Sequence, residues 1–488
     1  MAIEGITSYY HENRPLLSVA SEKECERIIE GSLEVLEKTG MVIQSPRALN
    51  LLVENGCSAE GDKVKIPSSL VKEAISSAAK EMVLYTRNGE EAMRVGGLSN
   101  YYGPGPTNPF VNDFHTGEVR SPQKSDIGNT ATVVDACEHI DYVMGLANVM
   151  DYDVCVADVA ETHEVLQNTT KPSVLWAVDP TGMQDTFDMC AAVAGGWEKF
   201  LEKPFMCMFP GCPQTPLILN ADIYNKFEYA IKKGVPCLVM TGPQLGAVAP
   251  VTMAGSTIIG LAEMFTMLVL SQLLRKGSVL VMGIVVVTMD MKSTRSAYGT
   301  PEHCLCDSLQ SDIFHYLNLP HVGTGGVTEA KIVDEQSAIE SSMQILTDTL
   351  SGSNMVHDVG FLDGAMSGSL DQIVMCDEII AYAKRFTKGI NFDDEHLALE
   401  AIHEVGPGGE FLTEEHTFDN YRDELWVPSL HDREQYATWL TEGKKDMRTR
   451  IHEKTAHILT HHSCEPLSKE VIGKLDEIWE RAQKRVNA

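Results

Sequence analysis

The chain has 488 residues, of which 43% are apolar and 22% are charged, so it can bury the sizeable core of a globular protein. Its 69 acidic and 39 basic residues give a net charge of −30, which disfavours binding to nucleic acids or anionic membranes. The first 14 residues are polar and lack the apolar run of a signal peptide. The twelve cysteines are scattered without a CxxC pair, which favours reduced thiols and a cytoplasmic location.

The N-terminal part of the chain is predicted to be mainly helical. Apolar residues recur at helical spacing in residues 21–38, 45–55 and 67–80, and the last two segments begin at Ser or Pro. Residues 82–120 instead contain short β-prone pieces split by Gly and Pro, including the sequence YYGPGP at 101–106. We therefore expect a first region, 1–120, of helices followed by a small β-rich insertion.

The central part alternates apolar β-rich runs with helical segments, which is typical of βα units around a parallel sheet. This pattern predicts an α/β protein with a TIM-type (β/α)8 barrel over residues 121–430. The eighth strand is expected either near 96–102 or in the Gly-rich tail. The apolar stretches 248–274 and 279–289 are too interrupted or too short for membrane spans. Seven strands are predicted, at 142–149, 173–178, 205–209, 236–240, 279–287, 321–324 and 355–360.

The C-terminal part is predicted to form helices outside the barrel. Helices are expected at 369–386 and 393–405, followed by a Gly-Pro-Gly-Gly turn at 406–409. Residues 431–488 form the third expected region, which is charged and helical in period from 432 to 487. It should pack outside the barrel or against another subunit, and a homo-oligomer is expected because most soluble oligomers are symmetric assemblies of one chain.

Functional groups in such barrels lie where strands end and loops begin. Aromatic residues make up only 7% of the chain, so their recurrence at predicted strand ends is informative. For any single aromatic residue, ordinary core or loop packing is the better explanation, and the set is more persuasive than its members. The strand-end candidates selected by this rule include Tyr102, Trp176, Asp179, Phe209, His357, Asp358 and Phe361.

Two further candidates lie on predicted helices. Glu263 falls within an apolar run, where an ionised carboxylate is costly unless it is paired or faces a cavity. It is therefore either a buried carboxylate with local hydrogen bonds or a site residue. His163, in the sequence ETHE, alone would be read as a structural histidine. The chain has no HExxH motif, and Cys304 and Cys306 are spaced too tightly for the usual zinc pairs, so no metal site is predicted.

Two Gly-containing segments are more specific. The first is GTGGVTEAK at 323–331, followed by Asp334 and Gln336, and the second is VGPGGEFLTEEHT at 405–417. Together with shorter matching points, these segments resemble the trimethylamine methyltransferase superfamily. In the archaeal enzymes of that superfamily the Gly-rich run holds pyrrolysine, and the aligned position here is Val327. The resemblance therefore indicates the non-pyrrolysine branch, whose members demethylate quaternary amines such as glycine betaine.

This resemblance implies a methyltransferase that passes a methyl group to Co(I) of a corrinoid. The corrinoid is carried by a separate protein and is not bound permanently. Glu263 and Val327 would lie at the catalytic centre, with Gly325, Gly326, Thr328 and His163 facing the corrinoid. A quaternary ammonium group is held by ring faces and nearby carboxylates. The expected cage consists of Tyr102, Trp176, Phe209 and Phe361 with Asp179 or Asp358, and the carboxylate anchors are Thr324, Thr328, His357 or Arg295.

Several alternatives remain open at this stage. The substrate could be glycine betaine, proline betaine, carnitine or γ-butyrobetaine. A cytoplasmic sensor that binds a betaine without turnover and a metal-assisted barrel hydrolase are the rival functions. The hydrolase would require a ligand cluster that the sequence does not show.

Overall fold

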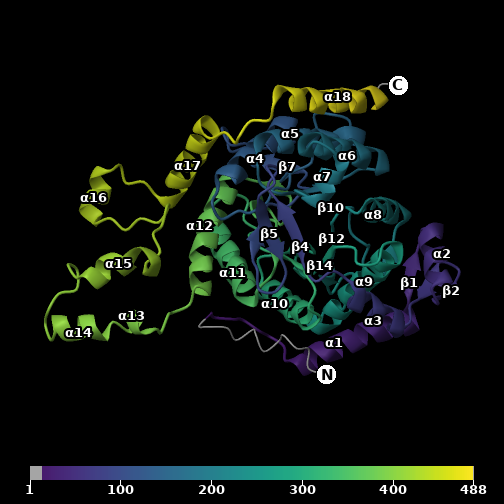
Figure 1. The fold of residues 1–488 in the computed structure, drawn as a ribbon, viewed down its shortest axis with the longest axis horizontal. Coiled ribbons are helices and arrows are strands. Elements are labelled where there is room, and N and C mark those ends of the chain that lie inside the picture. Colours follow the sequence, from purple (N-terminus) through teal and green to yellow (C-terminus); the bar gives the residue numbers. More distant parts are fainter. Residues whose placement is uncertain (1–13, 487–488) are drawn as a thin grey trace.

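The structure is a computed structural model that describes residues 14–486, and its centre is a closed barrel of eight parallel strand segments (Figure 1). The barrel closes because Tyr102 pairs with Val356 of the last strand, while its carbonyl accepts the backbone N–H of Tyr142. In order, the segments are β6 (Tyr101–Tyr102), residues 142–144, β9 (Ser173–Trp176), β10 (Met206–Phe209), β12 (Cys237–Thr241), β14 (Leu280–Ile284), β17 (Val322–Thr324) and β18 (Met355–His357). The predicted barrel is confirmed, and its eighth strand is β6 rather than the Gly-rich tail.

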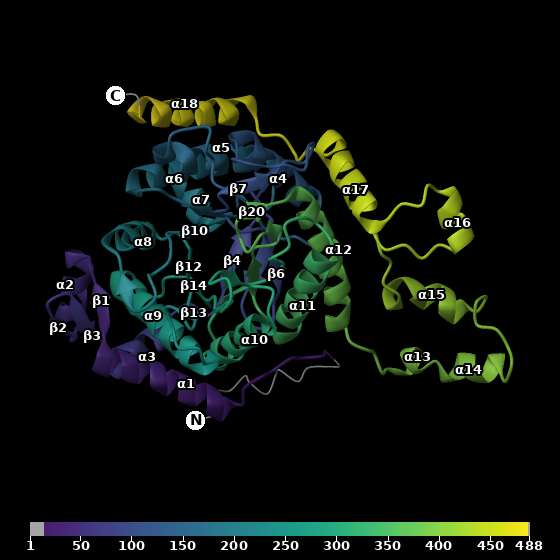
Figure 2. The same ribbon diagram turned by 180° about the vertical axis from the view of Figure 1, so that it is seen from behind.

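Helices follow the strands and form the outer ring of the barrel (Figures 1 and 2). Their starts are set by capping residues visible in the sequence. Asp179 accepts hydrogen bonds from the backbone N–H groups of Thr181 and Gly182, at 2.7 and 2.8 Å, and Asp334 accepts one from Ser337. The ring helices are α4 (Lys124–Ala136), α5 (Ala157–Asn168), α6 (Pro180–Ala194), α8 (Ala221–Lys233), α9 (Met253–Leu274), α10 (Pro301–Tyr316), α11 (Glu335–Ser351) and α12 (Leu370–Thr387), with the short α7 (Trp197–Glu202) after α6.

The interior of the barrel is filled by apolar side chains at its N-terminal end. A hairpin of β4 (Met82–Tyr85) and β5 (Glu91–Val95) supplies Met82, Leu84, Met93 and Val95 to this cluster. Its loop bonds to the segments that precede β9 and β10. The hairpin therefore closes the N-terminal end, so a binding site must lie at the opposite end.

The N-terminal helical region is confirmed and covers one side of the barrel. It contains α1 (Glu22–Glu34), the π-helical turn Val35–Thr39, α2 (Pro46–Glu54) and α3 (Ser68–Ser77), with strands β1 (Met41–Ile43), β2 (Ser58–Glu60) and β3 (Lys63–Lys65). β1 also pairs with β11 (Ile218–Leu219) of the barrel. The region packs α1 and α3 against α9. By length and composition α9 is the one described helix able to cross a membrane, but it lies between this region and the sheet and is 78% buried.

Short strands build the loops at the C-terminal end of the barrel. They pair among themselves and make the loops ordered extensions of the barrel strands. One set is β7 (Phe110–Asn112), β8 (Val119–Arg120), β19 (Phe361–Leu362) and β20 (Ser367–Gly368), and the other is β13 (Gln244–Leu245), β15 (Val287–Met289) and β16 (Ser296–Ala297). The 3-10 turn Val154–Val156 precedes α5.

The C-terminal part divides into an arm and two packed helices. Residues 388–446, called the arm below, leave α12 and extend sideways from the barrel before the chain returns (Figures 1 and 2). The arm contains α13 (Asp394–Leu397), α14 (Leu399–Val405), α15 (Glu415–Glu424) and α16 (Tyr436–Thr441). Helices α17 (Met447–His461) and α18 (Lys469–Val486) then pack on α12, α4, α5 and α6. The division at 120 and 430 remains a prediction; β6, which closes the barrel, lies before residue 121.

Candidate functional site

The site begins at the end of β18, where His357 and Asp358 follow each other. Nδ1 of His357 lies 2.5 Å from Oδ1 of Asp358, and its Nε2 lies 2.9 Å from Oγ1 of Thr324 on the neighbouring strand. An ionised carboxylate only accepts hydrogen bonds, so Nδ1 carries the proton that it donates to Asp358. The Asp358 backbone has φ +75, a left-handed conformation that Asp tolerates better than most residues. The histidine and the turn together fix the direction of the carboxylate.

Aromatic residues surround this carboxylate. The phenols of Tyr142 and Tyr298 are buried, which raises their pKa, and the charge of Asp358 raises it further in both. The Tyr142 hydroxyl is buried and has no hydrogen-bond partner within residues 14–486. Phe361 lies beside Asp358, because a Cβ added to Gly105 would fall 2.1 Å from Oδ1 of Asp358 and 2.3 Å from the Phe361 ring. The site thus combines one carboxylate with three aromatic rings.

The loop after β6 must contain glycine to approach this cluster. Besides the contacts of Gly105, a Cβ on Gly103 would lie 2.4 Å from the Tyr142 ring. Only a residue without a side chain allows the backbone to pack directly against the ring and the carboxylate. The Gly-Pro-Gly sequence after the paired tyrosines is therefore the local feature that shapes this side of the site.

Cys212 and Glu263 lie on the adjacent side of the barrel end. Cys212 is solvent-exposed, although the protein atoms around it, together with the charges of Glu263 and Asp358, raise the pKa of its thiol to about 12. Glu263 accepts hydrogen bonds from the backbone N–H of Leu217 at 2.7 Å, from the Thr215 hydroxyl at 2.9 Å and from the Thr241 hydroxyl. Its own pKa is raised by burial, against the opposing effect of these hydrogen bonds. Glu263 therefore fastens the loop after β10 to the end of β12.

Trp176 and Phe209 lie opposite each other at the ends of β9 and β10. The indole N–H of Trp176 donates to Oε2 of Glu161 on α5 at 2.7 Å. Glu161 is buried, and this burial raises its pKa to about 8 despite the hydrogen bond from Trp176. Because its other oxygen has no hydrogen-bond partner within residues 14–486, Glu161 is held mainly as a neutral acid that orients the indole.

The structure brings only part of the predicted site together. His357, Asp358 and Phe361 form one cluster, and Trp176 and Phe209 form a cross-strand pair. Tyr102 lies elsewhere, because its hydroxyl bonds to the Thr349 hydroxyl on α11, outside the barrel. Asp179 caps α6.

Of the residues predicted to face a corrinoid, His163 lies away from this cluster, whereas the backbone N–H groups of Gly325 and Thr328 donate to the carbonyls of His357 and Phe361 within it. His163 is on the outer side of α5, where its Nε2 is 2.9 Å from Asp476 of α18. Gly325, Gly326, Val327 and Thr328 are buried where the loop after β17 packs on α11. The backbone N–H of Val327 donates to Gln344, and its side chain has no exposed surface. Arg295 pairs with Asp363 at 3.0 Å on the surface of the barrel mouth, which is formed by the loops at the carboxyl ends of the strands.

Sequence reasoning missed Tyr142, Tyr298, Cys212 and Glu161. Tyr142 begins a predicted strand, and its apolar neighbours indicated a residue of the hydrophobic core. Tyr298 and Cys212 lie in long loops, whose paths no local pattern defines. The Gly-Pro-Gly sequence at 103–105 was the available signal, because close backbone approach marks sites of tight contact. Across residues 14–486, no group of three or more His, Cys, Asp or Glu side chains is arranged to hold a metal ion.

The fold is that of a (β/α)8 barrel, and the candidate site at the carboxyl ends of its strands places an acidic group among aromatic rings. The solved structure of the monomethylamine methyltransferase MtmB from Methanosarcina barkeri has the same fold. It superposes with a TM-score of 0.53 over 99% of this chain and 90% of that one, at 11% identity.

Sequence comparison gives the family. The model of the trimethylamine methyltransferase (MTTB) family matches residues 2–486, and the chain belongs to this family of methyltransferases. It is 30% identical to trimethylamine methyltransferase MttB of Desulfitobacterium hafniense, over 95% of this chain and 93% of that protein. It is 27% identical to a glycine betaine methyltransferase from another strain of that species, over 97% and 98%. The family predicted from the two Gly-containing segments is confirmed.

Proposed function

We propose that this methyltransferase removes a methyl group from a quaternary amine and passes it to Co(I) of a corrinoid on a partner protein. The carboxylate of Asp358 among Tyr142, Tyr298 and Phe361 is the observation that carries the proposal. A quaternary ammonium group cannot donate a hydrogen bond, so a protein binds it through ring faces and negative charge. Glycine betaine is the leading substrate; proline betaine, carnitine and γ-butyrobetaine are its close alternatives.

The reaction asks the protein mainly for orientation. As the N–CH3 bond breaks, its electron pair stays on nitrogen, which leaves as a neutral tertiary amine. Co(I) supplies both electrons of the new bond to the methyl carbon. No proton has to be transferred. Asp358 therefore needs only to hold the cation in line with the acceptor, while the surrounding rings exclude water. Val327, at the position that resembles the pyrrolysine site, brings no electrophile to this reaction.

The surroundings also suppress competing nucleophiles. A thiolate or phenolate beside the substrate would itself attack the methyl group. Burial and the charge of Asp358 raise the pKa of Tyr142 and Tyr298. The protein atoms around the exposed Cys212, with the charges of Glu263 and Asp358, raise the pKa of its thiol to about 12, so all three groups stay protonated near neutral pH. The negative charge that binds the substrate therefore also protects the protein from methylation.

Exposed apolar side chains around the barrel end support a protein partner there. Ten of them, called the rim below, lie in or beside the loops that follow the strands. Within residues 14–486, none of the large exposed apolar side chains lies in a segment that leads from a helix into a barrel strand. Apolar patches of this kind mark interaction sites. The rim residues are Phe110, Val119, Met150, Tyr152, Val154, Val248, Val251, Met291, Ile332 and Met366.

The experiment that tests the function is methylation of reduced cob(I)alamin, followed by its absorbance change. The panel contains glycine betaine, proline betaine, carnitine, γ-butyrobetaine and trimethylamine. Methylcobalamin formed from one betaine and not from trimethylamine is the expected result and names the substrate. Turnover of trimethylamine alone would overturn the quaternary-amine proposal. Calorimetric binding of a betaine without turnover, even with the corrinoid protein present, would instead establish a sensor.

A further inference from the structure

The arm, residues 388–446, has no core of its own. Its helices α13, α14, α15 and α16 contain no buried residue, and Leu430 is the only buried residue in the whole segment. Helices of four to ten residues are unstable in water without tertiary packing. Each ordered residue also costs about 1–2 kcal/mol of backbone entropy, which no buried side chain of these four helices offsets within one copy.

The arm exposes many large apolar side chains. The exposed fraction is 75% for Leu412 and 68% for Phe418. Exposed apolar side chains are normal when they are scattered, but their concentration on one projecting segment indicates an interface. The full set is Ile390, Phe392, Leu397, Leu399, Ile402, Phe411, Leu412, Phe418, Tyr421, Leu425, Val427, Tyr436 and Leu440.

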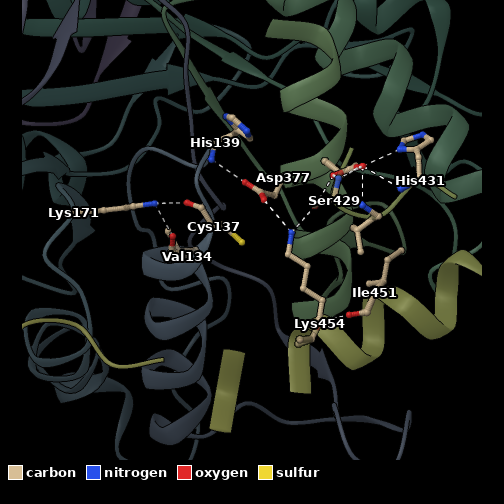
Figure 3. A network of polar contacts seen from close by, with 12 residues as sticks. Val134, Cys137, His139, Lys171, Asp377, Ser429, His431, Ile451 and Lys454 are labelled. Atoms are coloured by element: carbon tan, nitrogen blue, oxygen red, sulfur yellow. Dashed lines mark hydrogen bonds and ion pairs between the residues drawn. The ribbon is translucent and has the colours of Figure 1, made fainter. Parts of the chain in front are cut away.

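The root of the arm is nevertheless firmly attached to α12. Both carboxylate oxygens of the buried Glu378 accept backbone N–H groups of residues 429–431, and Nδ1 of His431 lies 2.9 Å from Oε1 (Figure 3). These hydrogen bonds outweigh the effect of burial and lower the pKa of Glu378 to about 2. Arg385 donates to the backbone oxygens of Gly389 and Glu424. The arm is therefore held in a defined direction, with its apolar side chains presented outward.

A cleft of about 560 Å³ lies at this root, and its lining includes the carboxylates of Glu138, Asp377, Glu378 and Asp423. Lys384, Arg385, Lys388, Arg422 and Lys454 line it, and within residues 14–486 neither Lys388 nor Arg422 forms an ion pair with a carboxylate. The arm itself carries fifteen Asp and Glu against five Lys and Arg. Lys388 and Arg422, the two cations of the cleft without an ion pair, thus complement the negative charge of an arm.

We propose that the arm packs against a second copy of this chain, with each acidic arm lying over Lys388 and Arg422 of the cleft at the root of the other. Such an exchange is self-complementary, as a two-fold interface requires. A permanent partner is needed because the apolar area is exposed in every state of the single chain. The corrinoid protein would have to leave after each methyl transfer, and the rim at the barrel end is the surface that suits it.

The sequence motif VGPGGEFLTEEHT at 405–417 belongs to this interface and not to the barrel end. It forms the turn between α14 and α15, with Gly406 and Gly408 at positive φ, and it presents Phe411 and Leu412 to solvent. Its role in the proposal is to shape the tip of the arm.

The test is sedimentation velocity of the full-length protein over a range of concentrations. The variant Leu412→Asp/Phe418→Asp is compared with Leu305→Asp/Val53→Asp, which alters exposed apolar residues of α10 and α2. We expect the wild type and the control to assemble at least as dimers, and the arm variant to dissociate about 100-fold more readily. The barrel should stay folded, because neither arm residue is buried.

A second variant and a second readout keep the test decisive. Lys388→Glu/Arg422→Glu should weaken assembly as well, since it removes the charge complementarity of the cleft. In the wild type, hydrogen exchange of the arm amides should speed up on dilution as the copies separate. A wild type that is monomeric at every concentration, or an arm variant that assembles as tightly as wild type, overturns the proposal. Arm amides protected only after the corrinoid protein is added would assign the arm to that partner.

Discussion

The barrel mouth, formed by the loops at the carboxyl ends of the strands, and the arm differ in how their side chains are stabilised. At the mouth, charged groups are buried and their hydrogen bonds come from the same chain: Asp358 is fixed by His357, and Glu263 by three donors. In the arm almost nothing is buried, and its short helices lack packing within one copy. The mouth is therefore preorganised by its own fold, whereas the arm depends on a second molecule.

The largest expected effect concerns the charge of the mouth. Asp358→Asn keeps the shape and tolerates the left-handed backbone, but it removes the negative charge facing the substrate cation. We expect kcat/KM for the quaternary amine to fall about 100-fold, most of it as a higher KM, because a desolvated charge pair contributes about 3 kcal/mol.

The matched control for this prediction is Asp290→Asn. Asp290 is also a carboxylate of the mouth, but it is exposed and bonds only within its own turn, to Ser293 and its neighbours. Steady-state methyl transfer should be unchanged in this variant. A wild-type KM in Asp358→Asn would contradict the assignment of the binding site.

A smaller effect, on the KM for the corrinoid protein, should distinguish the rim from the arm. Val251 and Met291 belong to the rim and are 69% and 74% exposed. The variant Val251→Asp/Met291→Asp should raise the KM for the corrinoid protein about tenfold, which corresponds to about 1.4 kcal/mol of lost contact. Turnover with free cob(I)alamin and the assembly state should both stay as in the wild type.

The arm variant Leu412→Asp/Phe418→Asp serves as the reciprocal control, since it should alter assembly and leave the KM for the corrinoid protein unchanged. Methyl-transfer kinetics and sedimentation measured on both variants give this two-by-two comparison. If the rim variant lost assembly, or the arm variant lost affinity for the corrinoid protein, the two surfaces would have been assigned to the wrong partners.

The sequence predicts the barrel well because most of its strands lie in apolar runs, and each run is followed by a helix. It predicts the site less well, because side-chain direction depends on register. β6 contains only Tyr101 and Tyr102, and adjacent residues of a strand face opposite sides. Tyr102 therefore points to α11, which no pattern in two residues could indicate. Asp179 followed by Pro180 is a typical sequence for a helix start, and in the fold Asp179 caps α6.

Glu263 illustrates a question that the sequence left open. An acid within an apolar helix is either structural or functional, and both options produce the same pattern. The structure shows three donors, from the loop after β10 and the end of β12, converging on its carboxylate. The donors belong to Thr215, Leu217 and Thr241, which lie 22–48 positions from Glu263 in the chain. No local sequence pattern could therefore reveal them.

The smallest expected effect contrasts two buried glutamates with opposite pKa shifts. Burial raises the pKa of Glu161 near the mouth from 4.5 to about 8, whereas hydrogen bonds hold that of Glu378 at the arm root at about 2. A raised pKa in the folded state gives a stability contribution that is complete below pH 4.5 and is lost as the pH rises towards 8. The contribution of Glu378 is already complete throughout that window, because it is lost only as the pH falls towards 2.

Thermal unfolding at a fixed scan rate between pH 5 and 8 should therefore distinguish the two positions. The wild type and Glu378→Gln should both lose about 3 °C in Tm as the pH rises through this window, while Glu161→Gln should lose less. Glutamine can still accept the hydrogen bond from the Trp176 indole, so the variant removes the titration and leaves the packing in place. An unchanged slope in Glu161→Gln would show that Glu161 is ionised in the folded protein, and that the mouth carries a second negative charge beside its aromatic residues.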